Sequence, residues 1–171
     1  ELAIVGTKSG VSFVDVSTDP TNPTEVGFIS GPNSSWRDMK TWSHYAYLVT
    51  EGGGGMQIVD LADPMNPQLV GSHASFNNAH AIFIDEFGFA YVVGSNQAGG
   101  GLHILDLADP ENPVVVGSWA SQYIHDVFVR DNKAWCACIY SGTVQVVDVT
   151  DKSNTVTVGS FSTTGNFTHN V

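Results

Sequence analysis

Apolar side chains alternate with polar or small ones along most of the chain, which is the period of a β-strand. In one stretch, four short apolar runs cover residues 79–84, 89–94, 102–107 and 114–119. Turn-forming sequences separate these runs: Asp-Glu-Phe-Gly, three consecutive glycines, and Asp-Pro-Glu-Asn-Pro. No run of ten or more residues has the period of an amphipathic helix. The pattern therefore predicts an all-β protein.

A unit of this kind repeats four times along the chain. Each copy holds an apolar run with an Asp, then a turn of the form Asp-Pro-X-Asn-Pro or a variant of it, then a glycine in the next run. The aspartates are Asp15, Asp60, Asp106 and Asp148, spaced 45, 46 and 42 residues apart. Four short antiparallel strands in a repeat of about 40–50 residues are typical of a β-propeller blade. A β-sandwich has no reason to repeat one turn sequence four times.

The repeats predict a β-propeller of four-stranded blades, with about four blade equivalents in one domain or propeller segment over residues 1–171. With strands named a to d from the axis outward, residues 2–30 supply b, c and d of the first blade. Three blades cover 36–73, 79–119 and 124–161, and residues 167–171 supply a closing strand a. Either the two ends pair and close a four-bladed ring, or the chain is a segment of a larger ring completed by further residues or a second chain. An open array leaves sheet edges and apolar faces in water, so we expect closure of some kind.

The repeated turn has a local cause. Proline presets the backbone for a turn, and Asp and Asn accept hydrogen bonds from nearby backbone N–H groups. We therefore expect Asp15, Asp60, Asp106 and Asp148 to stabilise the turns that follow them. The alternative, a calcium ligand in each repeat, is less consistent with the pattern, because one acid in about 45 residues is not a dense cage of oxygens.

The charge balance restricts the partners. The 171 residues include 6 Lys and Arg against 17 Asp and Glu, a net charge of −11. Nucleic acid is excluded as a partner because phosphate binding needs a basic face, and an anionic membrane surface is disfavoured for the same reason. No run reaches the roughly 18 apolar residues of a membrane span, and none has the apolar core of a signal peptide. The chain opens at Glu1 inside a strand-like run, so we expect a leader or a larger N-terminal part to precede it.

Two cysteines, Cys136 and Cys138, lie two residues apart in an apolar run. They are too close in sequence for an unstrained disulfide within one extended strand, and no second Cys-X-X-Cys accompanies them as a zinc site requires. We expect two small buried apolar side chains.

The most informative position lies at the start of each strand a, where the repeats align Arg37, His80, His125 and His169. The next position holds Asp38, Ala81, Asp126 and Asn170, and Trp36 precedes the first of them. Three hypotheses stay open. These side chains close the ring by hydrogen bonds between blades; or His80, His125 and His169 bind a transition metal supported by Asp38 or Asp126; or Arg37, Asp38, Trp36 and Asp126 bind a small, for example anionic, ligand. His44, His73 and His103 fall outside this position, and we expect surface or packing roles for them.

The repeated Ile/Val-Val-Asp-Val/Leu-X-Asp-Pro-X-Asn-Pro unit resembles the LVIVD repeat, and the wider pattern resembles the choice-of-anchor B family of bacterial surface propellers. Matching stretches cover 3–6, 34–40, 78–81, 101–106, 124–126, 147–154 and 167–169. The resemblance implies a secreted or cell-surface protein whose C-terminal anchor varies between members.

These observations favour an extracellular or cell-surface binding or scaffolding module whose axial channel takes a ligand or ion, with a surface or extracellular partner. The first alternative is a metal-dependent enzyme in which His80, His125 and His169 hold the metal, Asp126 acts as base or supports a ligand, and Arg37 holds an anion. The second is a self-assembling surface protein in which neighbouring chains complete one another's sheets.

Overall fold

The computed structural model describes residues 1–171, which form fifteen strands and two short 3₁₀ turns. The strands make four sheets, each an antiparallel meander in chain order. The first sheet contains β1 (Leu2–Thr7), β2 (Gly10–Asp15) and β3 (Thr24–Ser30), and the second β4 (Arg37–Trp42), β5 (Tyr45–Thr50), β6 (Met56–Asp60) and β7 (Gln68–His73). The third contains β8 (Ala81–Ile84), β9 (Phe89–Val93), β10 (Leu102–Asp106) and β11 (Val114–Trp119), and the fourth β12 (Asp126–Arg130), β13 (Lys133–Cys138), β14 (Thr143–Asp148) and β15 (Val156–Ser162). The turns are η1 (Ala98–Gly100) and η2 (Thr164–Asn166).

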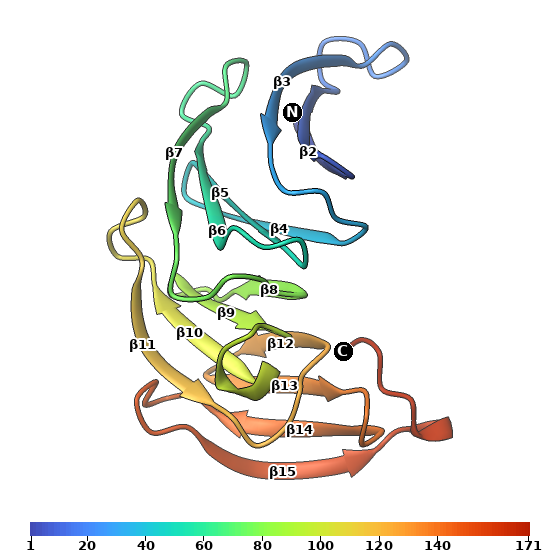
Figure 1. Cartoon of the computed structure of the whole chain (residues 1–171), viewed down its shortest axis with the longest axis vertical. Coiled ribbons are helices and arrows are strands. Elements are labelled where there is room, and N and C mark those ends of the chain that lie inside the picture. The colour runs from blue at the N-terminus through green and yellow to red at the C-terminus, as the bar shows by residue number, and fades with distance from the viewer.

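The four sheets follow one another along an arc that opens on one side (Figure 1). The strands β4, β8 and β12 lie on the inner side of this arc, and β7, β11 and β15 lie on the outer side. On the inner side β8 contacts both β4 and β12. Successive meanders that radiate from a common axis are propeller blades. The predicted all-β propeller architecture is confirmed.

The ends of the arc do not meet as a closed four-bladed ring. Strand β1 pairs only with β2, so the first sheet has three strands and an open inner edge. Residues 167–171, which we expected as a closing strand, form no strand. The physical reason is their register: β8 and β12 begin one residue after His80 and His125, so a strand at the equivalent position starts only at Asn170. No second strand lies beside it to supply backbone partners.

The core lies between consecutive sheets, and the two-residue period of the strands explains why. In β5, Ala46 and Leu48 pack toward the first sheet in a cluster with Phe13. The alternate residues Tyr47 and Val49 pack toward the third sheet in an eleven-residue cluster. A fourteen-residue cluster fills the space between the third and fourth sheets. A strand in the middle of a sheet, such as β5, is therefore apolar on both faces, which stabilises the stack of sheets through burial.

The expected turn-stabilising role of the repeated aspartates is confirmed. One carboxylate oxygen of each accepts a hydrogen bond from the backbone N–H two residues later, at distances of 2.7–2.9 Å, and the four pairs are Asp15–Ser17, Asp60–Ala62, Asp106–Ala108 and Asp148–Thr150. The Asp that opens each Pro-containing turn makes the same bond, as Asp63 does to Met65. Both aspartates of the motif therefore satisfy backbone donors that leave the strand.

The repeated glycine makes room for the turn of the next sheet. In every sheet the last two strands pair with a register shift beside this glycine, so the residue directly before it bulges from the ladder. A Cβ on Gly27 would lie 3.0 Å from Pro67, and a Cβ on Gly117 would lie 1.6 Å from the backbone oxygen of Lys152. The turn of one sheet therefore rests directly on the outer strand of the sheet before it.

The two cysteines are free and buried, as expected. Burial raises the pKa of Cys138 to about 11 and raises the pKa of Cys136 well above its ordinary value. Both thiols are therefore protonated at neutral pH and pack as small apolar side chains. None of the chain's helical turns is long and apolar enough to cross a membrane.

Candidate functional site

The inner strands bring one row of side chains together near the axis. Arg37 begins β4, and His80 and His125 lie directly before β8 and β12. His169 continues the row, because the backbone N–H of Val171 donates to Asp126 as that of Ile82 donates to Asp38. We call Arg37, His80, His125 and His169 the axial row.

The three imidazoles of the axial row contact one another ring to ring. The ring centroids of His80 and His125 are 4.1 Å apart, and those of His125 and His169 are 4.0 Å apart. On the other side, the Trp36 indole stacks on His80 at 4.4 Å with the two planes only 8° from parallel. The indole N–H of Trp36 donates to the backbone oxygen of His80 at 2.6 Å. A continuous column of rings therefore crosses the three inner strands.

Hydrogen bonds determine the tautomers of these histidines. The Nδ1 of His80 lies 2.8 Å from a carboxylate oxygen of Glu51, and the Nδ1 of His125 lies 2.9 Å from the backbone oxygen of His169. Because both partners only accept hydrogen bonds, each Nδ1 carries the proton. A neutral ring then has an unprotonated Nε2, which accepts a hydrogen bond or binds a cation. Burial, together with the neighbouring imidazoles, lowers the pKa of His125 and favours its neutral form.

A cavity of about 230 Å³ opens beside this column. Six of the seven site residues expected from the sequence line it: Trp36, Arg37, Asp38, His80, His125 and Asp126. His169 lies against His125 rather than in the cavity wall. The His80 side chain is only 9% exposed, and its Nε2 is the one buried side-chain polar atom in the chain without a hydrogen-bond partner. An unsatisfied buried polar atom costs about 1–3 kcal/mol, so this nitrogen is the polar atom of the site that still lacks a partner.

Of the two aspartates beside the axial row, Asp38 connects consecutive sheets and Asp126 holds the C-terminal segment. Asp38 Oδ2 accepts from the backbone N–H of Ile82 at 2.9 Å, and Asp126 Oδ2 accepts from that of Val171 at 3.2 Å. The other oxygen of Asp38 accepts from Lys40 Nζ at 3.0 Å. The hypothesis that these side chains hold neighbouring blades together therefore describes Asp38, whereas Asp126 bonds to a segment that forms no blade.

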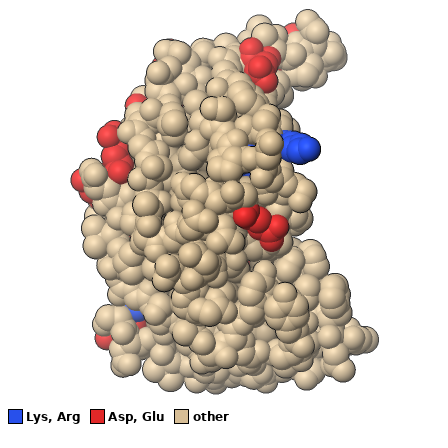
Figure 2. Space-filling view, in the orientation of Figure 1, with Lys and Arg blue, Asp and Glu red and all other residues tan.

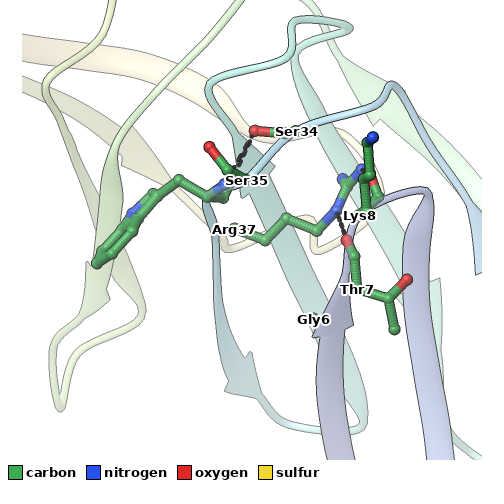
Figure 3. A pocket seen from close by; sticks show the side chains of 7 residues that line it. Gly6, Thr7, Lys8, Ser34, Ser35 and Arg37 are labelled. Carbon is green, nitrogen blue, oxygen red and sulfur yellow. Dashed lines mark hydrogen bonds between the residues drawn. The ribbon is translucent and has the colours of Figure 1, made fainter.

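Arg37 also connects sheets, and it points away from the histidines. Its Nε donates to the backbone oxygen of Thr7 at 2.7 Å, and its Nη2 donates to the backbone oxygens of Lys8 and Pro32. Figure 3 shows this side chain reaching across to Thr7 in the wall of a second cavity of about 620 Å³. Three backbone carbonyls thus accept hydrogen bonds from the guanidinium, and the role of Arg37 in holding an anion stays a prediction.

The structure does not arrange the three histidines as a metal centre. No group of three or more His, Cys, Asp or Glu side chains in the chain is placed to hold a metal ion. The imidazoles contact one another ring against ring, and the Nδ1 atoms of His80, His125 and His169 each face an oxygen, which leaves the Nε2 atoms as the remaining lone-pair donors. Metal ligation by His80, His125 and His169 therefore stays a prediction, and it requires the three side chains to direct lone pairs at one point.

Sequence reasoning missed Glu51, the partner of His80. The signal was present, because Glu51 follows β5 directly. In an antiparallel pair the end of strand b lies at the same edge as the start of strand a, so a residue after β5 lies near the axial row. Carboxylate–imidazole pairing of this kind orients the ring and makes its free nitrogen more basic.

A second group of histidines lies between β7 and β10. The Oγ of Ser75 is 2.6 Å from the Nε2 of His73 and 2.8 Å from that of His103. The Phe76 ring contacts both imidazoles. The packing role expected for His73 and His103 fits these contacts, whereas the bridging hydroxyl was not anticipated from the sequence. His44 lies largely exposed against Tyr45.

The buried imidazoles predict how stability depends on pH. Burial lowers the pKa of His73, His103 and His125 below the ordinary value of 6.5. As the pH falls through 6.5, the unfolded chain therefore binds more protons than the folded chain, and the free energy of unfolding decreases. The decrease stops once the pH is below the pKa values that these histidines have in the folded state. We expect a lower Tm at pH 5 than at pH 7.5, measured by thermal unfolding. We expect the difference in Tm between the two pH values to be smaller in His103→Phe. An equal Tm at pH 5 and pH 7.5 in the unmodified protein contradicts this prediction.

The arc of radial four-stranded sheets with its inner row of side chains defines a β-propeller repeat protein. More particularly, the model of the LVIVD repeat matches residues 37–75 and 79–121, which are the second and third sheets. Comparison with curated proteins finds no match.

Solved propeller structures resemble the chain in fold alone. A putative 6-phosphogluconolactonase from Bacteroides uniformis is 13% identical with a TM-score of 0.72, and the match covers 95% of this chain and 52% of that one. A functionally unknown protein from Desulfotomaculum acetoxidans is 12% identical with a TM-score of 0.70 and the same coverage. A chain of the nidogen/laminin complex is 11% identical with a TM-score of 0.65, covering 98% of this chain and 60% of that one. The chain therefore spans between half and two thirds of the length of these structures.

Proposed function

We propose that the chain is an extracellular β-propeller binding module that takes a small polyol, of the size of a monosaccharide, in the axial cavity. The observation that carries the proposal is the buried, unpartnered Nε2 of His80. The Glu51 carboxylate holds the proton on the other ring nitrogen, so Nε2 is an acceptor for a ligand hydroxyl. Small cavities in which a few polar groups converge are typical of ligand sites.

The remaining walls of the cavity suit the same class of ligand. The carboxylates of Asp38 and Asp126 can accept hydrogen bonds from the hydroxyl groups of a ligand, and the ammonium group of Lys40 can donate to those hydroxyl groups. Trp36 is 40% exposed and offers a flat apolar surface against which the C–H face of a sugar packs. The cavity volume of about 230 Å³ is below the roughly 300 Å³ at which pockets for drug-sized ligands begin, so the ligand is small.

The surface charge supports an extracellular setting. Figure 2 shows scattered acidic groups and few basic ones on a largely uncharged face, without a basic patch. The net charge of −11 keeps such a surface solvated and repels polyanions.

Saturation-transfer NMR with glucose, galactose and mannose tests this proposal. We expect transfer to at least one sugar, and binding weakened about tenfold in His80→Phe, because the ring contacts remain while one hydrogen-bond acceptor is lost. His44→Phe is the matched control, since His44 lies outside the cavity and retains full binding. No transfer to any of the sugars, or equal binding by both variants, overturns the proposal.

A further inference from the structure

A serine hydroxyl lies between two imidazoles where the second sheet packs on the third. The Oγ of Ser75 is 2.6 Å from the Nε2 of His73 and 2.8 Å from the Nε2 of His103. Because a hydroxyl carries one proton, it donates to one of these nitrogens and accepts from the other. Hydrogen bonds donated by O–H groups are shorter than those donated by N–H groups, so Ser75 donates to His73 and accepts from His103. The Nε2 of His73 is therefore an unprotonated base in contact with the hydroxyl proton.

The repeat does not require these two histidines. His73 lies two residues after the repeated glycine, where the third sheet has Trp119. His103 lies directly before the residue that faces this glycine, where the second and fourth sheets have Gln57 and Gln145. The serine does recur, because Ala-Ser follows Trp119 as it follows His73. The pair of imidazoles is therefore an addition to the repeat at one contact between blades.

Packing holds both imidazoles in place. The buried Phe76 ring contacts them, with centroid distances of 6.3 Å to His73 and 5.9 Å to His103. Burial lowers the pKa of both rings, which keeps them neutral at pH 7. His103 is only 7% exposed, whereas His73 is partly exposed, so water can solvate a proton that His73 takes up. His73 thus suits the role of general base, and His103 that of a fixed N–H donor.

Ser75 lines a cavity of about 370 Å³, which is within the size range of small-ligand pockets. The walls include Gly54, Gly55, Asn77 and Asn96, and no Lys or Arg that would hold a phosphate group. The Oδ1 of Asn77 accepts from the backbone N–H of Gly54 at 3.3 Å, and the Oδ1 of Asn96 accepts from that of Asn77 at 2.8 Å. With their oxygens held in this way, both amides keep their Nδ2 hydrogens for the oxygen of a bound carbonyl group.

We propose that Ser75 is a nucleophile for acyl transfer from small, uncharged carboxylic esters, with His73 as its general base. The Oγ of Ser75 bonds to the carbonyl carbon while its proton passes to the Nε2 of His73, and the amides of Asn77 and Asn96 donate to the developing oxyanion. The ester C–O bond then breaks, and the alcohol leaves with the proton from His73. Water next attacks the acylated Ser75 and gives a proton to His73. The carboxylic acid leaves, and the proton returns to the Oγ of Ser75.

Labelling with an uncharged fluorophosphonate ester tests the proposal on the 171-residue chain. The Oγ of Ser75 bonds to phosphorus, fluoride leaves, and the proton passes to His73. We expect one label per chain, mapped to Ser75 by mass spectrometry of peptides, and no label in Ser75→Ala. Ser121→Ala is the matched control, because Ser121 follows Trp119-Ala as Ser75 follows His73-Ala, with an indole in place of the imidazole. We expect this variant to be labelled like the unmodified protein.

Variants of the two histidines separate their roles. We expect His73→Phe to lower the labelling rate at least about 100-fold, the loss that removal of a general base causes. The fourth sheet has Phe161 at this position, so the fold accommodates the ring, and circular dichroism checks it. His103→Gln keeps an N–H donor, and we expect it to lower the rate less than His73→Phe does. A burst of one equivalent of p-nitrophenol from p-nitrophenyl acetate reports the acyl step in the same proteins.

Other outcomes overturn the proposal. No label on Ser75, or an unchanged rate in His73→Phe, means that the serine only bridges the two rings. Labelling of Ser75 and Ser121 at equal rates means that exposure rather than activation determines the reaction. A fall in His103→Gln as large as that in His73→Phe contradicts the assignment of the base. Sugar binding at the axial cavity is measured separately and can fail without affecting these results.

Discussion

Replacing Gly117 by alanine is expected to lower the free energy of unfolding by about 3 kcal/mol, at the upper end of what overpacking a filled site costs. The new Cβ would lie 1.6 Å from the backbone oxygen of Lys152 and 2.5 Å from its carbonyl carbon. Because backbone atoms cannot rotate away as a flexible side chain does, β11 and the turn of the fourth sheet must separate. Equilibrium unfolding in urea measures the loss.

Gly71→Ala is the matched control for this prediction. Gly71 holds the same register position in the second sheet, opposite Ile58 as Gly117 is opposite Ile104. A Cβ there meets nothing closer than 3.9 Å, and its backbone is not in the left-handed region. Because alanine restricts the unfolded chain more than glycine does, we expect a change within about 0.5 kcal/mol, of either sign. Equal losses in the two variants contradict the steric argument.

Replacing Asp85 by alanine is the second change with a large expected effect, a loss of about 3 kcal/mol. Asp85 is only 3% exposed and stands in the turn between β8 and β9. Its carboxylate accepts from the backbone N–H groups of Phe87 and Phe89 at 3.0 and 2.9 Å, and from the Tyr91 hydroxyl at 2.8 Å. Tyr91 is fully buried, so alanine leaves its hydroxyl without a partner inside the core. Urea unfolding again supplies the measurement.

Asp60→Ala is the matched control, because it shows how much stability is lost when any aspartate that stabilises a turn is removed. Asp60 accepts one backbone hydrogen bond, from Ala62 at 2.7 Å, and its side chain is 31% exposed. Water replaces that partner, so we expect a loss below about 1 kcal/mol. Tyr91→Phe is expected to fall between the two variants, because it removes one donor and leaves the carboxylate two others. If Asp85→Ala lowers the free energy of unfolding no more than Asp60→Ala does, the prediction is wrong.

Much of the fold was predictable because it is local and repeated. Alternation predicted the strands, and the turns follow from Asp and Pro, whose hydrogen bonds involve residues two positions apart. The spacing of the repeats also predicted the axial row, because equivalent residues of successive blades lie at the same height along the propeller axis. Six of the seven expected site residues consequently line one cavity.

The roles of those residues were less predictable. Arg37 shares its position with three histidines, yet its longer side chain reaches the carbonyls of Thr7 and Lys8 in the preceding sheet. The imidazoles adopt ring contacts rather than a ligand set, and Glu51 enters as the partner of His80. Each of these outcomes depends on side-chain direction and on neighbours far away in sequence, which spacing alone does not encode.

Repetition, alternation and turn chemistry are properties of neighbouring residues, and from them the order of strands, the blade architecture and the acidic, Lys-poor surface followed without coordinates. The open arc, the column of rings and the unpartnered nitrogen of His80 arose only when the sheets packed together. The reason is physical: a hydrogen bond within a turn is decided over two or three residues, whereas a contact between blades spans about 45 residues and depends on the curvature that all sheets produce together.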